Sequence, residues 1–202
     1  MMRGCMIATA VGLILLVGIG GCGVAKYNHI VTNHVGLSAQ WAEIDSQYKR
    51  RFDLIPNLIK TVKGAADFEQ SVLTEVTEAR ASVGRMQISG GLPTDPAELA
   101  AYMKAQQSLG ASLGRLIAVA ENYPQLKATQ GFLSLQDQLE GTENRIAVAR
   151  RDYIDGVRAY NTSIRKFPDN LLASAFGFEA VPQMEFDEVV QTVPEVEFDF
   201  GK

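Results

Sequence analysis

The chain has 202 residues, 47% of them apolar, and a formal net charge of −4, so it is long enough for one domain with a substantial core. Residues 179–202 hold seven acids against one lysine, whereas the rest of the chain balances 18 Lys and Arg against 16 Asp and Glu. This near-neutral body with an acidic tail lacks the dense basic face that nucleic-acid binding needs. Both cysteines, Cys5 and Cys22, belong to the N-terminal apolar run, so the remainder can form no internal disulfide and no thiolate metal site.

The N-terminal apolar run predicts a membrane anchor. Between Arg3 and Lys26 the sequence carries no charged residue, and residues 6–25 match the ~20 apolar residues that cross a bilayer core. Alternatively, residues 6–17 are the core of a signal peptide. The motif "IGGC" then resembles a lipoprotein processing box, with Cys22 as the lipidated first residue. Both alternatives tether the protein to a membrane. Arg3 favours a cytoplasmic N-terminus and an external body, the placement that a lipoprotein also requires.

The body is expected to contain four helices. From Tyr27 to Tyr48 apolar residues recur at steps of three, four and seven, which predicts a helix with one buried stripe. His34 lies on this stripe and is either a ligand or a packed side chain; we expect the packed side chain. Asp95 followed by Pro96 is an N-cap signal, and Pro124 interrupts a later helix. The expected helices cover residues 27–51, 54–84, 96–122 and 125–166.

The stretch "KRRFDLIPNLIKTVKG", residues 49–64, predicts a junction between the first two of these helices. Lys49, Arg50 and Arg51 suit a last helical turn, Asp53 suits the next N-cap, and Pro56 is tolerated in a first turn. Reversal there stacks helices of about 38, 46, 40 and 63 Å. The predicted fold is therefore all-α: an antiparallel up-and-down four-helix bundle with long, coiled-coil-like helices on an N-terminal membrane anchor.

The expected organisation has three parts. Residues 1–25 form the transmembrane anchor or lipoprotein signal, residues 26–168 the helical bundle, and residues 169–202 a short apolar segment with the acidic tail. The apolar segment is expected to pack back on the bundle as a half-turn or a short helix. The tail alternates acids with Val and Phe, so it is either a frayed end or an extended segment that binds a protein partner.

The sequence argues against several kinds of enzyme. Neither His29 nor His34 lies three residues after a glutamate, which excludes the di-iron site common in bundles. Motifs for a phosphate-binding loop, a serine hydrolase elbow or a zinc protease helix do not occur. We therefore assign no catalytic, cofactor-binding or metal-binding residue.

Polar residues close to the helix seams form the remaining candidate site. They are either a ligand site between helices or ion pairs and amide contacts that fix helix register, because buried charges need partners; we favour the second interpretation. These residues are Asp45, Arg51, Asp53, Asn57, Lys63, Glu69, Arg80, Glu143, Asn144, Arg151 and Asn161.

Two long stretches resemble the signatures of the LemA family. The first is "YNHIV" followed by "WAEIDSQYKRRFDLIPNLIKTVKGAADFE" and "VTEAR"; the second is "TENRIAVARRDYIDGVRAYNTSIRKFPDNLLASAFGF". The resemblance implies an N-terminal membrane segment, an antiparallel helical bundle and no established reaction, and its members include a magnetosome membrane protein. It also marks signature positions of unassigned role: Arg50, Arg51, Asp53, Pro56, Asn57, Asn144, Arg151, Tyr153 and Asn161.

These observations predict a non-enzymatic scaffold or adaptor held at a bacterial membrane, single-pass or lipid-anchored, with its body on the periplasmic or external side. Its expected partners are the membrane and other proteins, with the C-terminal tail as the candidate contact, and not nucleic acid. The alternative is a protein that binds a small anionic ligand through the Arg and Asn cluster of the bundle.

Overall fold

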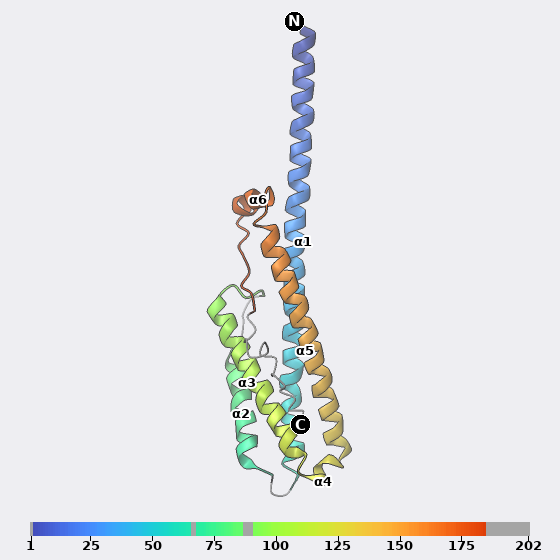
Figure 1. Ribbon diagram of the computed structural model, residues 1–202, viewed down its shortest axis with the longest axis vertical. Helices are drawn as coiled ribbons and strands as arrows, with labels where there is room; N and C mark the ends of the chain where they lie inside the picture. Colours follow the sequence, from blue (N-terminus) through green and yellow to red (C-terminus); the bar gives the residue numbers. More distant parts are fainter. Residues whose placement is uncertain (1, 66–67, 87–90, 185–202) are drawn as a thin grey trace, which may run out of the picture.

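The computed structural model describes residues 2–65, 68–86 and 91–184, and for these residues the fold is all-helical (Figure 1). The prediction of an all-α fold is confirmed. The acidic tail from residue 185 onward, with its proposed partner-binding segment, lies outside the described residues. The helices are α1 (Met2–Val62), α2 (Gln70–Arg85), α3 (Pro96–Ala120), α4 (Pro124–Lys127), α5 (Gln130–Ser163) and α6 (Asp169–Phe176).

The first helix is one continuous rod, and the predicted reversal at residues 51–54 is wrong. α1 contains 61 residues, which corresponds to about 90 Å at 1.5 Å per residue. The chain turns only after Val62, where Gly64 and Ala65 bond back to the last carbonyls of the helix. Asp53 is therefore an exposed residue inside α1 and not the N-cap of a second helix.

The buried residues of α1 explain this continuity. They alternate steps of four and three without a change of phase across the expected junction, so a single helix keeps them on one face. Buried side chains on this part of the seam are Ile44, Tyr48, Arg51, Ile55, Leu58 and Val62.

Pro56 lies inside α1 and removes one helical hydrogen bond, because proline has no N–H to donate to the carbonyl four residues earlier. That carbonyl belongs to Phe52, and Arg80 of α2 donates its Nε–H to it at 3.4 Å. The Arg80 guanidinium also lies 3.9 Å from the centre of the Phe52 ring. A cation from the neighbouring helix thus replaces the bond that the proline removes.

α5 lies along α1 and runs in the opposite direction (Figure 1). His34 contacts Tyr160 and Trp41 contacts Tyr153, with 5.6 Å between ring centres in each pair, so a seven-residue step in one helix matches a seven-residue step back in the other. His34 is packed and partly buried, as expected. Gly156 lets the helices approach closely here, because an added Cβ would collide with Gln40 and with Leu37.

α2 and α3 form a second helix pair, packed against the half of α1 that ends at Val62. Asp95 caps α3 as predicted, accepting a hydrogen bond from the Ala97 N–H at 2.8 Å. Pro124 ends the run of α3, also as predicted. The last long helix starts at Gln130 and not at residue 125, because Thr129 adopts an extended backbone that separates the single turn α4 from α5.

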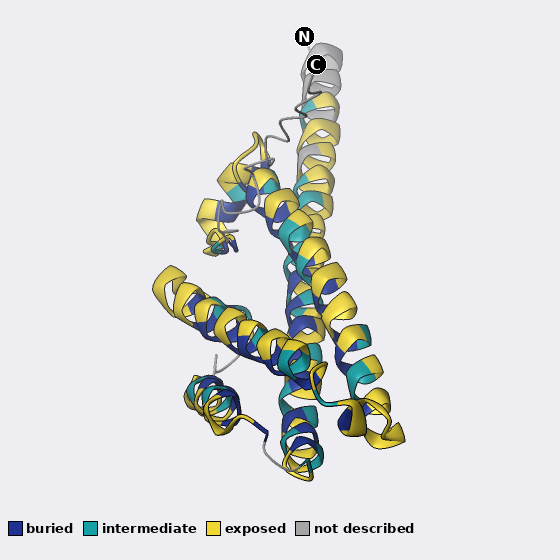
Figure 2. Cartoon of the chain, turned by 60° about the horizontal axis from the view of Figure 1, so that its bottom comes forward, coloured by how far each residue is buried: buried dark blue, intermediate teal, exposed yellow. Residues whose placement is uncertain are grey.

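Apolar residues gather in two core clusters along the rod. One joins α2, α3, α4 and the end of α1; the other joins the middle of α1 to α5, α6 and the segment after α6. The expected short helix after Pro168 is confirmed as α6, with Ala173, Val181 and Met184 buried against the second cluster. In Figure 2 the buried residues lie where the helices pack together, whereas the coloured part of α1 beyond the body is mostly exposed.

The exposed part of α1 includes Val11, Leu13, Ile14, Leu15, Leu16, Val17 and Val24, each at least half exposed. By length and composition α1 contains one stretch apolar enough to cross a membrane, and none of that stretch is buried against the rest of the chain. Cys22 lies within this part of the helix as an exposed free thiol.

Candidate functional site

The structure separates the predicted polar cluster into buried and exposed residues. Arg51 and Asn161 are buried, and they bind different parts of the chain. Five further polar residues among the signature positions do not line a common interior site. Arg50, Asp53, Asn57, Asn144 and Arg151 are exposed.

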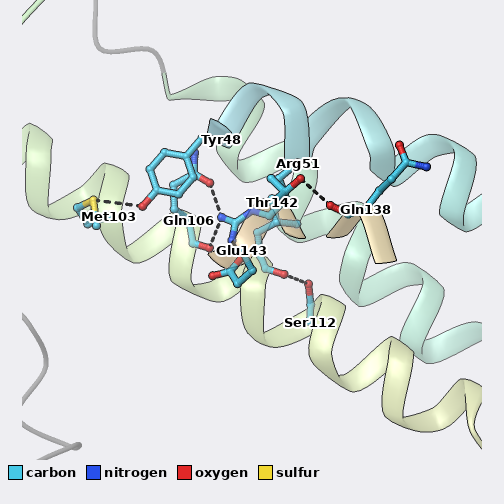
Figure 3. Close-up of polar contacts among 9 residues, drawn as sticks. Tyr48, Arg51, Met103, Gln106, Ser112, Gln138, Thr142 and Glu143 are labelled. Carbon is cyan, nitrogen blue, oxygen red and sulfur yellow. Dashed lines mark hydrogen bonds and ion pairs between the residues drawn. The ribbon is translucent and has the colours of Figure 1, made fainter. Parts of the chain in front are cut away.

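Arg51 links three helices (Figure 3). Its Nη1 donates to Glu143 Oε2 of α5 at 2.8 Å. Its Nη2 donates to the backbone carbonyl of Gln106 on α3 at 3.0 Å and to the Gln106 side-chain Oε1 at 2.7 Å. The guanidinium also lies 5.1 Å from the centre of the Tyr48 ring, one turn earlier on α1.

The surroundings of Arg51 suit a cation that is taken out of water. Its side chain is only 3% exposed, whereas Glu143 remains 58% exposed. A buried charge is tolerated when hydrogen bonds satisfy it. Here an amide oxygen, a carbonyl and a carboxylate accept from the two Nη atoms, whereas the buried Nε bonds to no described residue. Gly110 of α3 borders the guanidinium, and a Cβ there would lie 3.4 Å from Arg51 Nη1, at the edge of ordinary contact.

Tyrosines border this site and stay protonated. Burial raises the pKa of Tyr48, and the charges of Arg150 and Arg51 oppose that shift. Burial also raises the pKa of Tyr102, with a further contribution from the Asp45 carboxylate, which accepts the Tyr102 hydroxyl bond at 3.4 Å. The arrangement is therefore a hydrogen-bonded packing site bordered by tyrosine hydroxyls.

Asn161 holds the segment that follows α6 against α5. Its Nδ2 donates to the Val181 carbonyl at 2.8 Å, and its Oδ1 accepts from the Val181 N–H at 2.9 Å. The neighbouring Tyr160 hydroxyl donates to the carbonyl of Glu179 at 3.1 Å. The Asn161 amide thus pairs with both backbone groups of one residue, as an adjacent strand would.

Sequence reasoning missed Gln106 as the partner of Arg51. A signal was present: on α3 the buried residues also alternate steps of three and four, and Gln106 is the polar member of that series. The buried residues of this seam are Leu99, Tyr102, Gln106, Leu109, Leu113, Leu116 and Ala120. A polar residue within an apolar seam therefore marks a candidate partner for a buried cation such as Arg51.

Concave sites in the described part of the chain are small and open. One of about 350 Å³ lies beside Asn161, Arg165 and the segment around Val181; another of about 480 Å³ lies between His29, Arg158 and Lys166. Among the described residues, no group of three or more His, Cys, Asp or Glu side chains is placed to hold a metal ion.

The chain is similar to known proteins over most of its length. The family model described as the LemA family matches residues 40–198. The chain belongs to the LemA family. Its relatives include the magnetosome protein MamQ 2 of Paramagnetospirillum magneticum, 28% identical over 170 residues that cover 76% of this chain and 62% of that protein.

Two further relatives have similar coverage. The magnetosome protein MamQ of Magnetospirillum gryphiswaldense is 26% identical over 85% of this chain and 69% of its own length. The protein LemA of Metamycoplasma hominis is 22% identical over 82% of this chain and 72% of its own length. The chain thus spans a little under two thirds of the length of MamQ 2 of Paramagnetospirillum magneticum.

Proposed function

We propose that this LemA-family protein is a membrane-anchored helical scaffold or adaptor that acts through protein partners or membrane organisation and not through a reaction of its own. The observation that carries the proposal is the continuity of α1. The same helix supplies an exposed apolar segment before Lys26 and the buried seam of the body after it. A helix shared in this way would make the body continue the direction of the span.

The proposed body is an up-and-down four-helix bundle built from α1, α2, α3 and α5. Three features support it: the turn after Val62, the loop before the Asp95 cap and the break at Pro124 each reverse the chain between successive long helices. Arg51 then serves as a polar contact that fixes how α1, α3 and α5 align. Polar residues in otherwise apolar seams have this role in coiled coils.

We propose a transmembrane anchor in preference to lipidation at Cys22. The helix continues through Gly18, Gly20, Gly21 and Gly23 without interruption, which suits a span better than a processed signal. The body is proposed to lie on the periplasmic or external side, because Arg3 precedes the span. The relatives named as magnetosome proteins favour a role at a bacterial membrane.

Binding of a small anionic ligand is less well supported. The guanidinium of Arg51, the most buried cation of the signature set, already donates to Glu143 and to Gln106. A ligand would have to displace these acceptors or use the exposed Arg50 and Arg151.

Flotation of the full chain with lipid vesicles tests the anchor. Two arginines at Leu13 and Leu16 should abolish flotation, because each charge near the centre of a span costs about 2.5–3.5 kcal/mol. The matched control places two arginines at Val35 and Val148, which are also exposed but lie in the body, and it should float like the wild type. Flotation of the Leu13→Arg/Leu16→Arg variant at the wild-type level would contradict the anchor.

A second measurement tests the non-enzymatic part. Cross-linking in intact membranes from exposed positions of the body should give discrete adducts with other proteins. Turnover of a substrate by the purified chain, lost in Asn144→Ala without loss of helicity, would instead show an enzyme.

A further inference from the structure

α6 lies at the end of the body from which the apolar part of α1 emerges (Figure 1). Two contacts fix it there. Lys26, the first charged residue after the apolar segment, pairs with Asp169 at the start of α6, with 3.2 Å between Nζ and Oδ1. At the other end of α6, the ring of Phe176 lies 4.7 Å from the ring of Tyr27.

This end of the body exposes large apolar side chains. Phe167 is 81% exposed, Leu171 60% and Phe176 61%, although the neighbouring Ala173 is buried in the core. Exposed large apolar side chains this close in sequence favour a surface that contacts a membrane or another molecule. Cations accompany them: Arg165 and Lys166 directly precede Phe167 and are exposed.

We propose that α6, together with Phe167 and the Arg165–Lys166 pair, forms a membrane-contacting surface that rests on the headgroup region of the same bilayer that α1 crosses. The inference depends on the proposed transmembrane anchor, because the end of the span at Lys26 sets the depth of α6. Aromatic and aliphatic side chains enter the boundary between headgroups and acyl chains, while Lys and Arg attract anionic lipids. The occupant is a lipid surface, since α6 contacts Lys26 and Tyr27 directly after the apolar segment of α1, and Arg165 and Lys166 carry the charge that complements anionic headgroups.

Such contact would give the rod a second point of attachment. A single span leaves the body free to tilt and rotate about its axis, because tilt is set by packing and by interfacial anchors. With α6 on the bilayer, the α2–α3 pair is held at the far end of the body in a fixed direction.

Tryptophan fluorescence of the full chain in vesicles tests this contact. The chain has one tryptophan, Trp41, which is only 4% exposed and provides a constant background. Phe167→Trp and Leu171→Trp place a reporter on the surface, and Leu133→Trp places one at an exposed position near the opposite end of α5. The vesicles contain phosphatidylcholine and phosphatidylglycerol, with the phosphatidylcholine acyl chains brominated close to the headgroup.

The expected result is a blue shift and loss of emission by quenching for Phe167→Trp and Leu171→Trp, with Leu133→Trp matching the wild type. Arg165→Glu/Lys166→Glu in the Leu171→Trp chain should reduce that quenching. No difference between the three reporters, in protein that floats with the vesicles, would overturn the membrane contact and leave the anchor intact. Shielding of Leu171→Trp without quenching would assign the patch to a second copy of the chain and would also overturn it. Failure of the wild-type chain to float would overturn the anchor itself.

Discussion

The Nη1 of Arg51 lies 2.8 Å from Glu143 Oε2 in a seam where the neighbouring positions on α1 are apolar. The pair joins α1 to α5, and the bonds from Arg51 to Gln106 join α1 to α3. Glu143 is 58% exposed, whereas Gln106 is 3% exposed. Loss of the bonds to Gln106 should therefore lower the free energy of unfolding more than loss of the ion pair with Glu143.

Replacing Arg51 by methionine should lower the free energy of unfolding by about 1–3 kcal/mol, because the buried Oε1 of Gln106 loses its donor. Adding Gln106→Leu should restore most of the loss, since a well-packed apolar pair often replaces a buried polar one at little cost. Glu143→Gln should cost less than about 1 kcal/mol. Chemical denaturation of the four proteins measures these values.

The matched control is Arg115→Met on α3. Arg115 also pairs with a glutamate, Glu75, at 3.0 Å, but both side chains are exposed, so its loss should stay within about 0.5 kcal/mol. If Arg51→Met/Gln106→Leu were no more stable than Arg51→Met alone, the unpaired Gln106 Oε1 would not be the cause of the loss.

Alanine substitutions at Asp53 and Asp95 test whether α1 continues through residues 51–54 or a new helix starts there. Asp53→Ala should leave the free energy of unfolding unchanged or raise it by up to about 0.7 kcal/mol, because alanine is the better residue inside a helix. Asp95→Ala should lower it by about 0.5–2 kcal/mol through loss of the N-cap bond to Ala97. If Asp53→Ala lowered the free energy of unfolding as much as Asp95→Ala, Asp53 would act as an N-cap, and the chain would reverse at residues 51–54.

Much of the fold could be predicted from the sequence, and the main error has a physical explanation. The cations, Asp53 and Pro56 are local signals that each suit a helix end. The alternation of three and four from Ile44 to Val62 is a longer signal, and it continues in phase through all of them. Packing of that seam outweighs the local preferences, and Arg80 of α2 compensates Pro56 by bonding Phe52, a contact that no local pattern shows.

The candidate site was harder to predict than the fold. Arg51 could be recognised as a polar residue near a seam, but the helix that supplies its acceptors depends on the order in which the helices pack. Asn161 could likewise be singled out, although its partner is the backbone of Val181. Any residue type can offer backbone N–H and C=O groups, so the sequence does not indicate which residue Asn161 binds.

Stability should fall in alkaline solution through the buried tyrosines. Burial raises the pKa of Tyr153 above its ordinary value, so the folded chain keeps a proton that the unfolded chain releases. The protonated Tyr153 hydroxyl contributes fully to stability below about pH 10, the pKa of tyrosine in the unfolded chain. Above that pH the free energy of unfolding falls by about 1.4 kcal/mol per pH unit. Urea denaturation between about pH 8 and pH 11 measures the slope.

Tyr153→Phe should reduce that slope and raise stability at neutral pH by about 1 kcal/mol, because the Tyr153 hydroxyl is buried and bonds to no described residue. Tyr102→Phe is the control: it should also reduce the slope, but it should lower neutral stability, since its hydroxyl donates to Asp45. An unchanged slope in both variants would rule out these tyrosines as the cause.

The intact mass of the protein extracted from membranes tests the central claim, that α1 runs as one helix from a membrane span into the body. We predict a chain that keeps the residues before Cys22, carries no acyl group on that thiol, and is unaffected in processing by Cys22→Ser. A spanning helix needs those residues, because about 20 apolar positions are required to cross the bilayer. Loss of residues 1–21 together with acyl mass on Cys22 would contradict the account, since the membrane attachment would then be a lipid and not α1.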